Sequence, residues 1–272
     1  MILNINDVHN KLFEKSNEII TKIHLLCNYN KRYKTFEISE NFLPTSIIHL
    51  KIDFKIANYK FLEKLINLKT LDLEGESFHH SHFNFDNINL PISMLNLVIA
   101  NSDSYNIFYP YWLKNLSNLQ YLDLSDINNF AVESSKLIDI LPDSLRTLIC
   151  SGNHLPTNVN NLILSLKNLD ILELISTNGY VENFENAVVP PKLKILKIGG
   201  FYFEHTNSLS ELKNLQTFSD SCSNFLMCKE INFPTSITRL ILYKTFIEDF
   251  TFLKFLNNLK YLKFTNILKT IF

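Results

Sequence analysis

One short stretch of the chain shows the pattern that the rest repeats: Leu145-Arg146-Thr147-Leu148-Ile149-Cys150-Ser151-Gly152-Asn153-His154-Leu155. Apolar residues stand at its first, fourth and sixth positions. The alternation with a period of two predicts a short β-strand in which Leu148 and Cys150 point to the same side. A single strand of this length buries too little apolar surface to be stable alone, so the stretch predicts neighbours of the same kind.

The same motif returns along the chain at a regular interval. Its first position falls at ten residues: Ile47, Leu68, Met94, Leu119, Leu145, Leu169, Leu193, Leu215, Ile237 and Leu259. Subtracting consecutive residue numbers gives steps of 21 to 26 residues, a spacing typical of solenoid repeats. We therefore predict an α/β solenoid of ten stacked parallel strands over residues 43–266, in which rows of leucine and isoleucine bury one another.

The openings of the repeats alternate between two types. Proline-type repeats open with proline shortly before the motif: Leu43-Pro44-Thr45-Ser46, Leu90-Pro91-Ile92-Ser93, Leu141-Pro142-Asp143-Ser144, Pro190-Pro191-Lys192 and Phe233-Pro234-Thr235-Ser236. Asparagine-type repeats open with Leu-x-Asn-Leu, ending at Leu68, Leu119, Leu169, Leu215 and Leu259. Because proline resists a helix and helix-like runs such as 61–65 precede the asparagine type, we expect helical and extended segments to alternate on the convex side.

This alternating pattern resembles the leucine-rich repeat family, and the LPxSL and LxNL openings look like those of repeat proteins from large DNA viruses and amoebae. Residues 145–155 fit the family motif LxxLxLxxNxL, with Asn153 at the ladder asparagine, although Glu76 and Ile127 stand at that position in other repeats. The resemblance covers residues 43–266 and implies a horseshoe-shaped solenoid with its strands on the concave face. The register predicts that four central leucines are buried: Leu122, Leu148, Leu172 and Leu196.

Residues 1–42 lack the motif, and we predict that they form a helical N-terminal cap before a repeat domain at 43–272. Asp7 could begin one helix, and Ser16 could begin a second that carries Ile23 and Leu26. Such helices would cover the first open strand edge of the solenoid.

The same segment weakly resembles an F-box in its order of an acidic opening, an apolar run and a Leu-Cys-x-x-x-Lys/Arg-aromatic stretch. It departs from that family where Ile5-Asn6 stands in place of Leu-Pro, and Tyr33 stands where tryptophan or phenylalanine is common. The resemblance implies an alternative function, in which residues 1–42 dock to the adaptor of a cullin–RING ubiquitin ligase and the repeats act as substrate receptor.

The composition of the chain argues against nucleic-acid binding and nucleotide binding. A net charge of -1 lacks the electrostatic signature of a nucleic-acid binder, and no GxGxxG or GxxxxGK[ST] occurs among only 5 glycines. We expect no cofactor. The chain has no apolar run of membrane-spanning length, and the spacing of its 4 cysteines fits no disulfide framework. Because residues 1–7 do not combine a basic start with an apolar core, we expect no signal peptide. An intracellular, cytoplasmic location without a membrane partner follows as an expectation.

Three clusters could carry chemistry, and each has a simpler explanation. His79, His80 and His82 could bind zinc, but a solvated loop is favoured and no metal is expected. Cysteines Cys222 and Cys228 have only His205 nearby in sequence as a base, and carboxylate pairs such as Asp123 with Asp126 lack a closed cleft. We predict a protein with no catalytic residues, which is not an enzyme.

The side chains that face outward from the predicted strands change character along the chain. Early repeats present acidic and polar groups such as Asp53, Asp72, Glu74, Tyr121 and Asp123. Later repeats present the residues that we predict bind a protein partner: Ile149, Ile171, Ile175, Ile195, Arg239, Ile241, Tyr243, Tyr261 and Lys263. Tyrosine and arginine are frequent at binding hot spots, although strand propensity alone also favours isoleucine.

The last predicted strand, 259–264, would leave an open edge with apolar neighbours. We expect a second copy of the chain or a partner to cover it, so self-association at this edge is a further prediction.

Overall fold

A computed structural model describes residues 2–4, 19–26, 35–73, 88–100, 111–126, 140–152, 166–176, 190–200, 207–221, 232–243 and 250–265. The chain forms two compact units. We call Met1–Ala131 the N-terminal unit and Val132–Phe272 the C-terminal unit.

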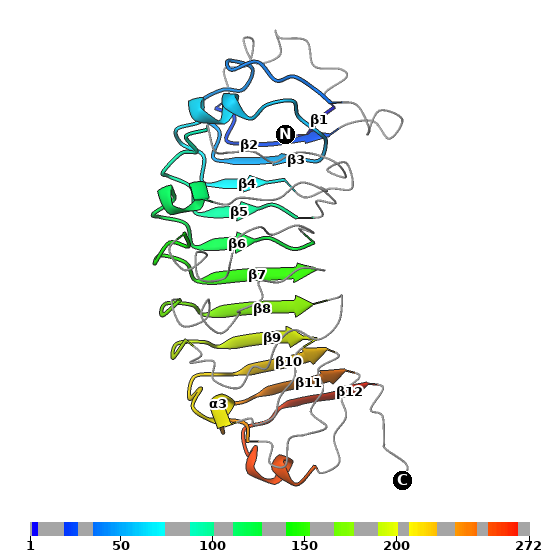
Figure 1. The fold of residues 1–272 in the computed structure, drawn as a ribbon. Coiled ribbons are helices and arrows are strands. Elements are labelled where there is room, and N and C mark those ends of the chain that lie inside the picture. The colour runs from blue at the N-terminus through cyan, green and yellow to red at the C-terminus, as the bar shows by residue number, and fades with distance from the viewer. Residues whose placement is uncertain are drawn as a thin grey trace. The chain divides into compact units, whose positions relative to one another are not determined.

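The N-terminal unit is a β-solenoid in which every described strand runs parallel to the next (Figure 1). Its strands are β1 (Ile2–Asn4), β2 (Lys22–Leu26), β3 (His49–Ile52), β4 (Thr70–Asp72), β5 (Asn96–Val98) and β6 (Tyr121–Asp123). Neighbours in the sheet are neighbours in sequence, from the pair β1 and β2 to the pair β5 and β6.

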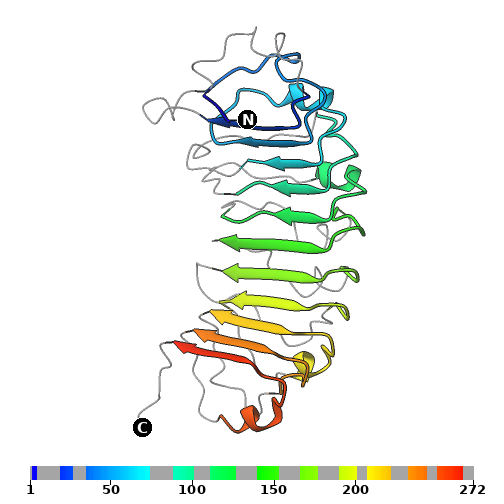
Figure 2. The same cartoon turned by 180° about the vertical axis from the view of Figure 1, so that it is seen from behind.

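The C-terminal unit repeats this architecture, and its ladder of strands is also visible from behind (Figure 2). Its strands are β7 (Thr147–Gly152), β8 (Ile171–Ser176), β9 (Ile195–Gly199), β10 (Thr217–Ser221), β11 (Arg239–Tyr243) and β12 (Tyr261–Thr265). They pair in parallel in chain order. Each strand from β3 to β12 begins two residues after a motif start, which confirms the ten predicted strands and their register.

The core of each unit consists of the rows that the motif predicts. Leu122, Leu148, Leu172 and Leu196 are all 0% exposed, as expected. Burying a leucine side chain contributes about 1.5–3 kcal/mol, so repeated rows supply most of the driving force. Asp220 is the exception, because this carboxylate is fully buried at a core position of β10 between Ile198 and Leu242.

The second helix predicted for the N-terminal segment is wrong over the described residues, because Lys22–Leu26 is strand β2. Ile23 and Leu25 are buried and alternate with more exposed neighbours, which is the period of a strand. Ile23 pairs with Leu50 and Leu25 with Ile52, so β2 is an additional repeat strand in front of the ten. The expected first helix at 7–13 lies outside the described residues.

Helical structure is much shorter than predicted for the convex side. The described part of the chain contains three 3₁₀ helices, η2 (Lys60–Lys64), η4 (Tyr111–Asn115) and η5 (Thr251–Phe255), and one α-helical turn, α3 (Asn207–Ser210). All four precede asparagine-type repeats, as expected, but each spans only four or five residues. The residues just before η2 and η5, Tyr59 and Phe250, make no capping hydrogen bond with their side chains. Segments with 3₁₀ hydrogen bonding are usually short, as these are.

Both repeat types enter the strand through the same tight turn. The N–H of the first motif residue donates to the carbonyl oxygen three residues earlier, at 2.8–3.2 Å in all ten repeats. The acceptor is Pro142 for Leu145 in a proline-type repeat, and Leu212 for Leu215 in an asparagine-type repeat. The proline and leucine openings therefore share one tight turn into the strand.

The two repeat types differ in how their turns bind one another within each unit. The asparagine of the Leu-x-Asn-Leu opening donates from Nδ2 to a turn carbonyl of the preceding repeat at 2.8–3.1 Å: Asn67 to Thr45, Asn118 to Ile92, Asn168 to Asp143, Asn214 to Pro191 and Asn258 to Thr235. Two serines of proline-type repeats, Ser93 and Ser236, donate to the asparagine-type repeat before them, Ser236 Oγ to Leu215 O at 2.7 Å. The alternation of openings thus builds a hydrogen-bonded ladder of turns.

Candidate functional site

The candidate site is the outer strand face of the C-terminal unit, which we define as the strand positions that alternate with its buried rows. Register places these positions in three rows from β7 to β12. The first row is Thr147, Ile171, Ile195, Thr217, Arg239 and Tyr261; the second is Ile149, Glu173, Lys197, Ser219, Ile241 and Lys263; the third is Ser151, Ile175, Gly199, Ser221, Tyr243 and Thr265. All nine predicted partner-binding residues lie in these rows, and their role in binding stays a prediction.

The part of this face on β7, β8 and β9 is mainly aliphatic. Ile171 and Ile195 are direct neighbours in the first row, and Ile149 and Ile175 flank them diagonally. All four side chains are partly exposed. The predicted isoleucine patch is therefore present, on strands that bury the opposite face in the core.

An ion pair interrupts the aliphatic patch. Lys197 Nζ lies 2.8 Å from Glu173 Oε2, and the two residues are cross-strand neighbours. The lysine side chain is 46% exposed, so solvent screens the pair and its contribution to stability is small, about 0–1 kcal/mol. The pair neutralises the only carboxylate among the outer positions of β7–β12.

The part of the face on β11 and β12 is cationic and aromatic. Arg239 and Tyr261 are paired in register, and the guanidinium carbon lies 4.1 Å from the centre of the tyrosine ring. This distance is that of a cation–π contact, which holds the guanidinium over the ring. Lys263 follows in the next row and is exposed, while Tyr243 is partly buried.

Small residues separate the aliphatic and cationic parts. Strand β10 presents Thr217, Ser219 and Ser221. Beside Ser221, a Cβ on Gly199 would collide with the Ser221 Oγ and carbonyl oxygen and would come within 3.2 Å of Ile175 Cγ2. Gly199 is a residue that sequence reasoning missed. The scarcity of glycine, with 5 in the chain and two together at Gly199-Gly200, was the available signal.

The outer strand face of the N-terminal unit is polar instead. Its rows are Lys22, His49, Thr70, Asn96 and Tyr121, and Ile2, His24, Lys51, Asp72, Val98 and Asp123. Lys51 Nζ lies 2.8 Å from Asp72 Oδ2, and Asn96 Nδ2 donates to Thr70 Oγ1 at 3.1 Å. Much of the hydrogen-bonding capacity of this face is used internally.

His24 lies on this polar face with its Nε2 shielded from solvent and without a hydrogen bond. Burial lowers the pKa of His24 below its ordinary value of 6.5, helped by nearby Lys51 and opposed by the carboxylates of Asp53 and Asp72. The imidazole is therefore mainly neutral at pH 7.

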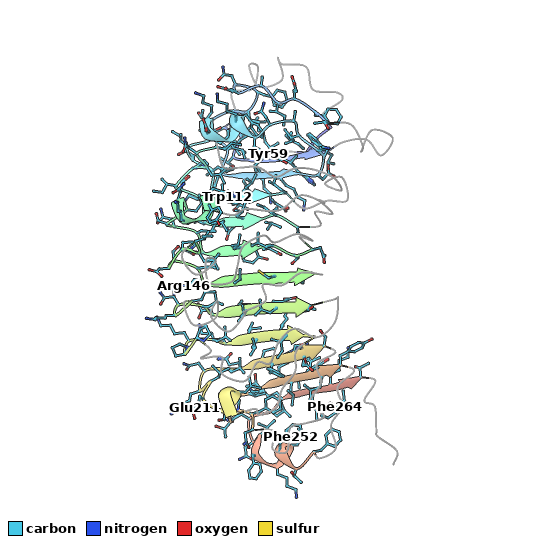
Figure 3. The ribbon with its side chains drawn as sticks, in the orientation of Figure 1. Tyr59, Trp112, Arg146, Glu211, Phe252 and Phe264 are labelled. Carbon is cyan, nitrogen blue, oxygen red and sulfur yellow. The ribbon has the colours of Figure 1, made fainter. Side chains whose placement is uncertain are left out.

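The other sequence candidates lie mostly outside the described residues. These are His79, His80, His82, His205, Cys222, Cys228, Glu74 and Glu76. Within the described ranges, no group of three His, Cys, Asp or Glu side chains could hold a metal ion. Cys150 is buried on β7, and Trp112 is buried in η4 (Figure 3).

None of the helices in the described part of the chain has the length and apolar character that a membrane crossing requires.

No protein-family model and no curated protein matches the chain. Solved structures that resemble it include an internalin (inlF) from Listeria monocytogenes, with 18% identity over 82% of this chain and 75% of that chain and a TM-score of 0.42. A plant peptide hormone receptor, RGFR1, in complex with RGF2 has 15% identity over 98% of this chain but only 38% of that chain, with a TM-score of 0.45. Internalin C2 (inlC2) from Listeria monocytogenes has 17% identity over 80% and 72%, with a TM-score of 0.33.

These similarities are too low to assign a function, which has to be argued from the residues of the chain itself. The architecture implied by the leucine-rich repeat resemblance, parallel strands stacked on buried leucine rows, is the one that each unit has.

Proposed function

We propose that the chain is a non-enzymatic protein-interaction module that binds a protein partner through the outer strand face of its C-terminal unit. The observation that carries this proposal is the aliphatic patch of Ile149, Ile171, Ile175 and Ile195 at partly exposed strand positions. Solvated strand faces are usually polar, and apolar patches that remain exposed commonly mark interaction surfaces.

Strand propensity alone is a weaker explanation of the isoleucines. The outer positions of β1–β6 belong to the same kind of strand and would experience the same preference, yet Ile2 of β1, in register with His24, is the only isoleucine among them. The outer positions of β7–β12 contain five, the four of the patch and Ile241. This enrichment of isoleucine in one unit favours a functional requirement over a general strand preference.

The cationic and aromatic end of the face supplies the residue types that dominate binding energy in known interfaces. Arginine and tyrosine are enriched at hot spots, and a stacked guanidinium such as that of Arg239 is already partly ordered before binding. We propose Arg239, Tyr243 and Tyr261 as anchors, with Ile241 and Lys263 beside them.

The proposal is tested with immobilised full-length protein that captures partners from a lysate of the source organism. The double variant Tyr243→Ala/Tyr261→Ala should lose the captured protein while its thermal stability stays close to that of the wild type. The matched control reverses two charges on the other unit, Asp72→Lys/Asp123→Lys, and should retain the partner. Normal capture by the tyrosine variant together with loss in the control would move the binding surface to the N-terminal unit.

The alternative function, docking of residues 1–42 to a cullin–RING ligase adaptor, stays a prediction. Deleting the segment would be a poor test, because β2 covers the edge of β3 and its removal would expose the core row at Leu50. A better test measures binding of the purified adaptor to the full-length chain and to a variant with substitutions at Arg32 and Tyr33.

Self-association at the β12 edge also stays a proposal, and side-chain exposure supports it. Leu262 is 41% exposed, whereas Leu240, its neighbour in the same core row, is fully buried. Phe255 in η5 is 68% exposed beside a packed series of rings that includes Phe252 and reaches Phe264 (Figure 3). Sedimentation equilibrium should show a dimer that Leu262→Ser weakens, and a strict monomer at high concentration would remove the proposal.

A further inference from the structure

The charges on the outer strand face of the C-terminal unit are unevenly distributed. Lys197, Arg239 and Lys263 are its cations, and Glu173 is its only carboxylate. Because Glu173 is bound to Lys197, two cations remain on β11 and β12 without an opposing charge on the face. Arg239 stacks on Tyr261, and no described carboxylate forms an ion pair with it.

The apolar and cationic groups share one row across the strands. Ile171 on β8, Ile195 on β9, Thr217 on β10 and Arg239 on β11 are successive partners in register. Adjacent strands are about 4.8 Å apart, so three steps from Ile171 to Arg239 span about 14 Å. Same-side residues in an extended peptide are about 6.7 Å apart, so a separation of four residues covers about 13 Å.

We propose that this face binds an extended, acidic segment of the protein partner. The segment lies across the strands with an aliphatic side chain over Ile171 and Ile195, and a carboxylate four residues away reaches Arg239. The inference rests on the proposed function and specifies the chemistry of the partner.

The arrangement of Arg239 suits a carboxylate in particular. A planar guanidinium can donate two parallel hydrogen bonds to a carboxylate, and the contact with the Tyr261 ring holds the Arg239 guanidinium in place on this face. Lys263 adds a second positive charge one row away on β12. Thr217, between the aliphatic and cationic ends, contributes a hydroxyl that can bind the backbone of the segment.

The test is a selection of displayed random peptides on immobilised full-length protein. We expect enriched peptides to carry aspartate or glutamate four residues from an aliphatic residue. Synthetic peptides from the selection should bind in fluorescence polarisation and lose about tenfold in affinity when the acid is replaced by its amide, because a charge-assisted bidentate contact is lost.

Variants of the protein locate the contact. Arg239→Gln should reduce the affinity for the acidic peptides about tenfold and leave the affinity for the amide peptides unchanged. Arg239→Lys should recover only part of it, because lysine lacks the planar fork. The matched control is Arg146→Gln, which removes an exposed arginine in the leading turn of β7, where it donates to Asn168 O at 3.0 Å; this variant should bind like the wild type.

The outcomes separate this inference from the proposed function. Peptides without an acid preference, or an acid preference that survives Arg239→Gln, would overturn the acidic segment while leaving a protein-binding face in place. Failure to enrich any peptide would also overturn it. Binding of a short oligothymidylate that Arg239→Gln abolishes would replace the occupant by a nucleic acid. The proposed function itself fails only if the variant Tyr243→Ala/Tyr261→Ala captures the partner as well as the wild type does.

Discussion

On the outer face of the N-terminal unit, side chains bind one another: Lys51 binds Asp72, and Asn96 binds Thr70. On the corresponding face of the C-terminal unit, isoleucines occupy such positions, and Arg239 stacks on Tyr261 without a described carboxylate partner. The buried rows behind both faces are leucine-rich and equally well covered at mid-unit. The difference therefore comes from outer positions alone, which the fold leaves free to carry function.

If the two units share one structural principle, removing a core leucine should cost the same in each. We expect Leu97→Ala in the N-terminal unit and Leu172→Ala in the C-terminal unit each to lower the free energy of unfolding by about 2–5 kcal/mol, since both side chains are 0% exposed. Urea unfolding followed by Trp112 fluorescence reports the first variant, and circular dichroism reports the second. A cost below about 0.5 kcal/mol for either, which is typical of surface changes, would contradict its place in the core.

The next effect is confined to the C-terminal unit, where Gly199 allows β9 and β10 to approach closely. Gly199→Ala places a methyl group against both the hydroxyl and the carbonyl of Ser221, and we expect a loss of about 1–3 kcal/mol from overpacking. Because the carbonyl clash remains, the added change Ser221→Ala should restore only part of the stability. Full stability in Gly199→Ala, measured by urea unfolding, would show that the two strands can separate without cost.

The hydrogen-bonded ladder of turns is common to both units, and removing one of its hydrogen bonds should lower stability less than the core changes do. Asn214→Ala removes the hydrogen bond from Nδ2 to Pro191 O, and we expect a loss of about 1 kcal/mol. The exposed turn residue Asn257 is the matched control, and Asn257→Ala should change stability by less than about 0.5 kcal/mol. Equal effects of the two substitutions would mean that the ladder contributes little beyond the backbone turns.

The repeat motif predicts much of this structure because each strand copies the last. Its period places all ten later strands and buries Leu148 and Leu172 as expected. Strand β2 was missed because its motif, Ile20-Thr21-Lys22-Ile23-His24-Leu25, follows neither proline nor Leu-x-Asn. The hydrogen-bonded ladder of turns could not be predicted either, because it depends on where a side chain in one turn meets a carbonyl in another.

For the candidate site, too, the sequence predicts the positions of the residues but not the contacts between their side chains. Arg239 and Tyr261 both stand two residues after a motif start, so the period alone makes them neighbours. Their stacking distance and the pairing of Lys197 with Glu173 depend on rotamers, which the sequence pattern does not specify. The charge left on β11 and β12 therefore became visible only in the structure.

The smallest expected effect separates the units by their response to acid. His24 belongs to the N-terminal unit, and its pKa in the folded protein is lowered by burial, while the unfolded chain has the ordinary value of about 6.5. Above that pH both states hold a neutral imidazole, and His24 does not make stability depend on pH. As the pH falls below about 6.5, the unfolded chain binds the proton first, so the free energy of unfolding decreases until the folded protein also becomes protonated.

We expect His24→Gln to remove this part of the acid sensitivity. Trp112 is the single tryptophan and lies in the N-terminal unit, so its fluorescence during urea unfolding reports the relevant transition. The difference in the free energy of unfolding between wild type and variant is measured at pH 7.5 as a reference. At pH 5.5 the variant should be more stable relative to the wild type than it is at pH 7.5. A shift in favour of the wild type would mean that Asp53 and Asp72 outweigh burial and raise the pKa of the imidazole. The described part of the C-terminal unit contains no histidine, so this response should be absent from its strands.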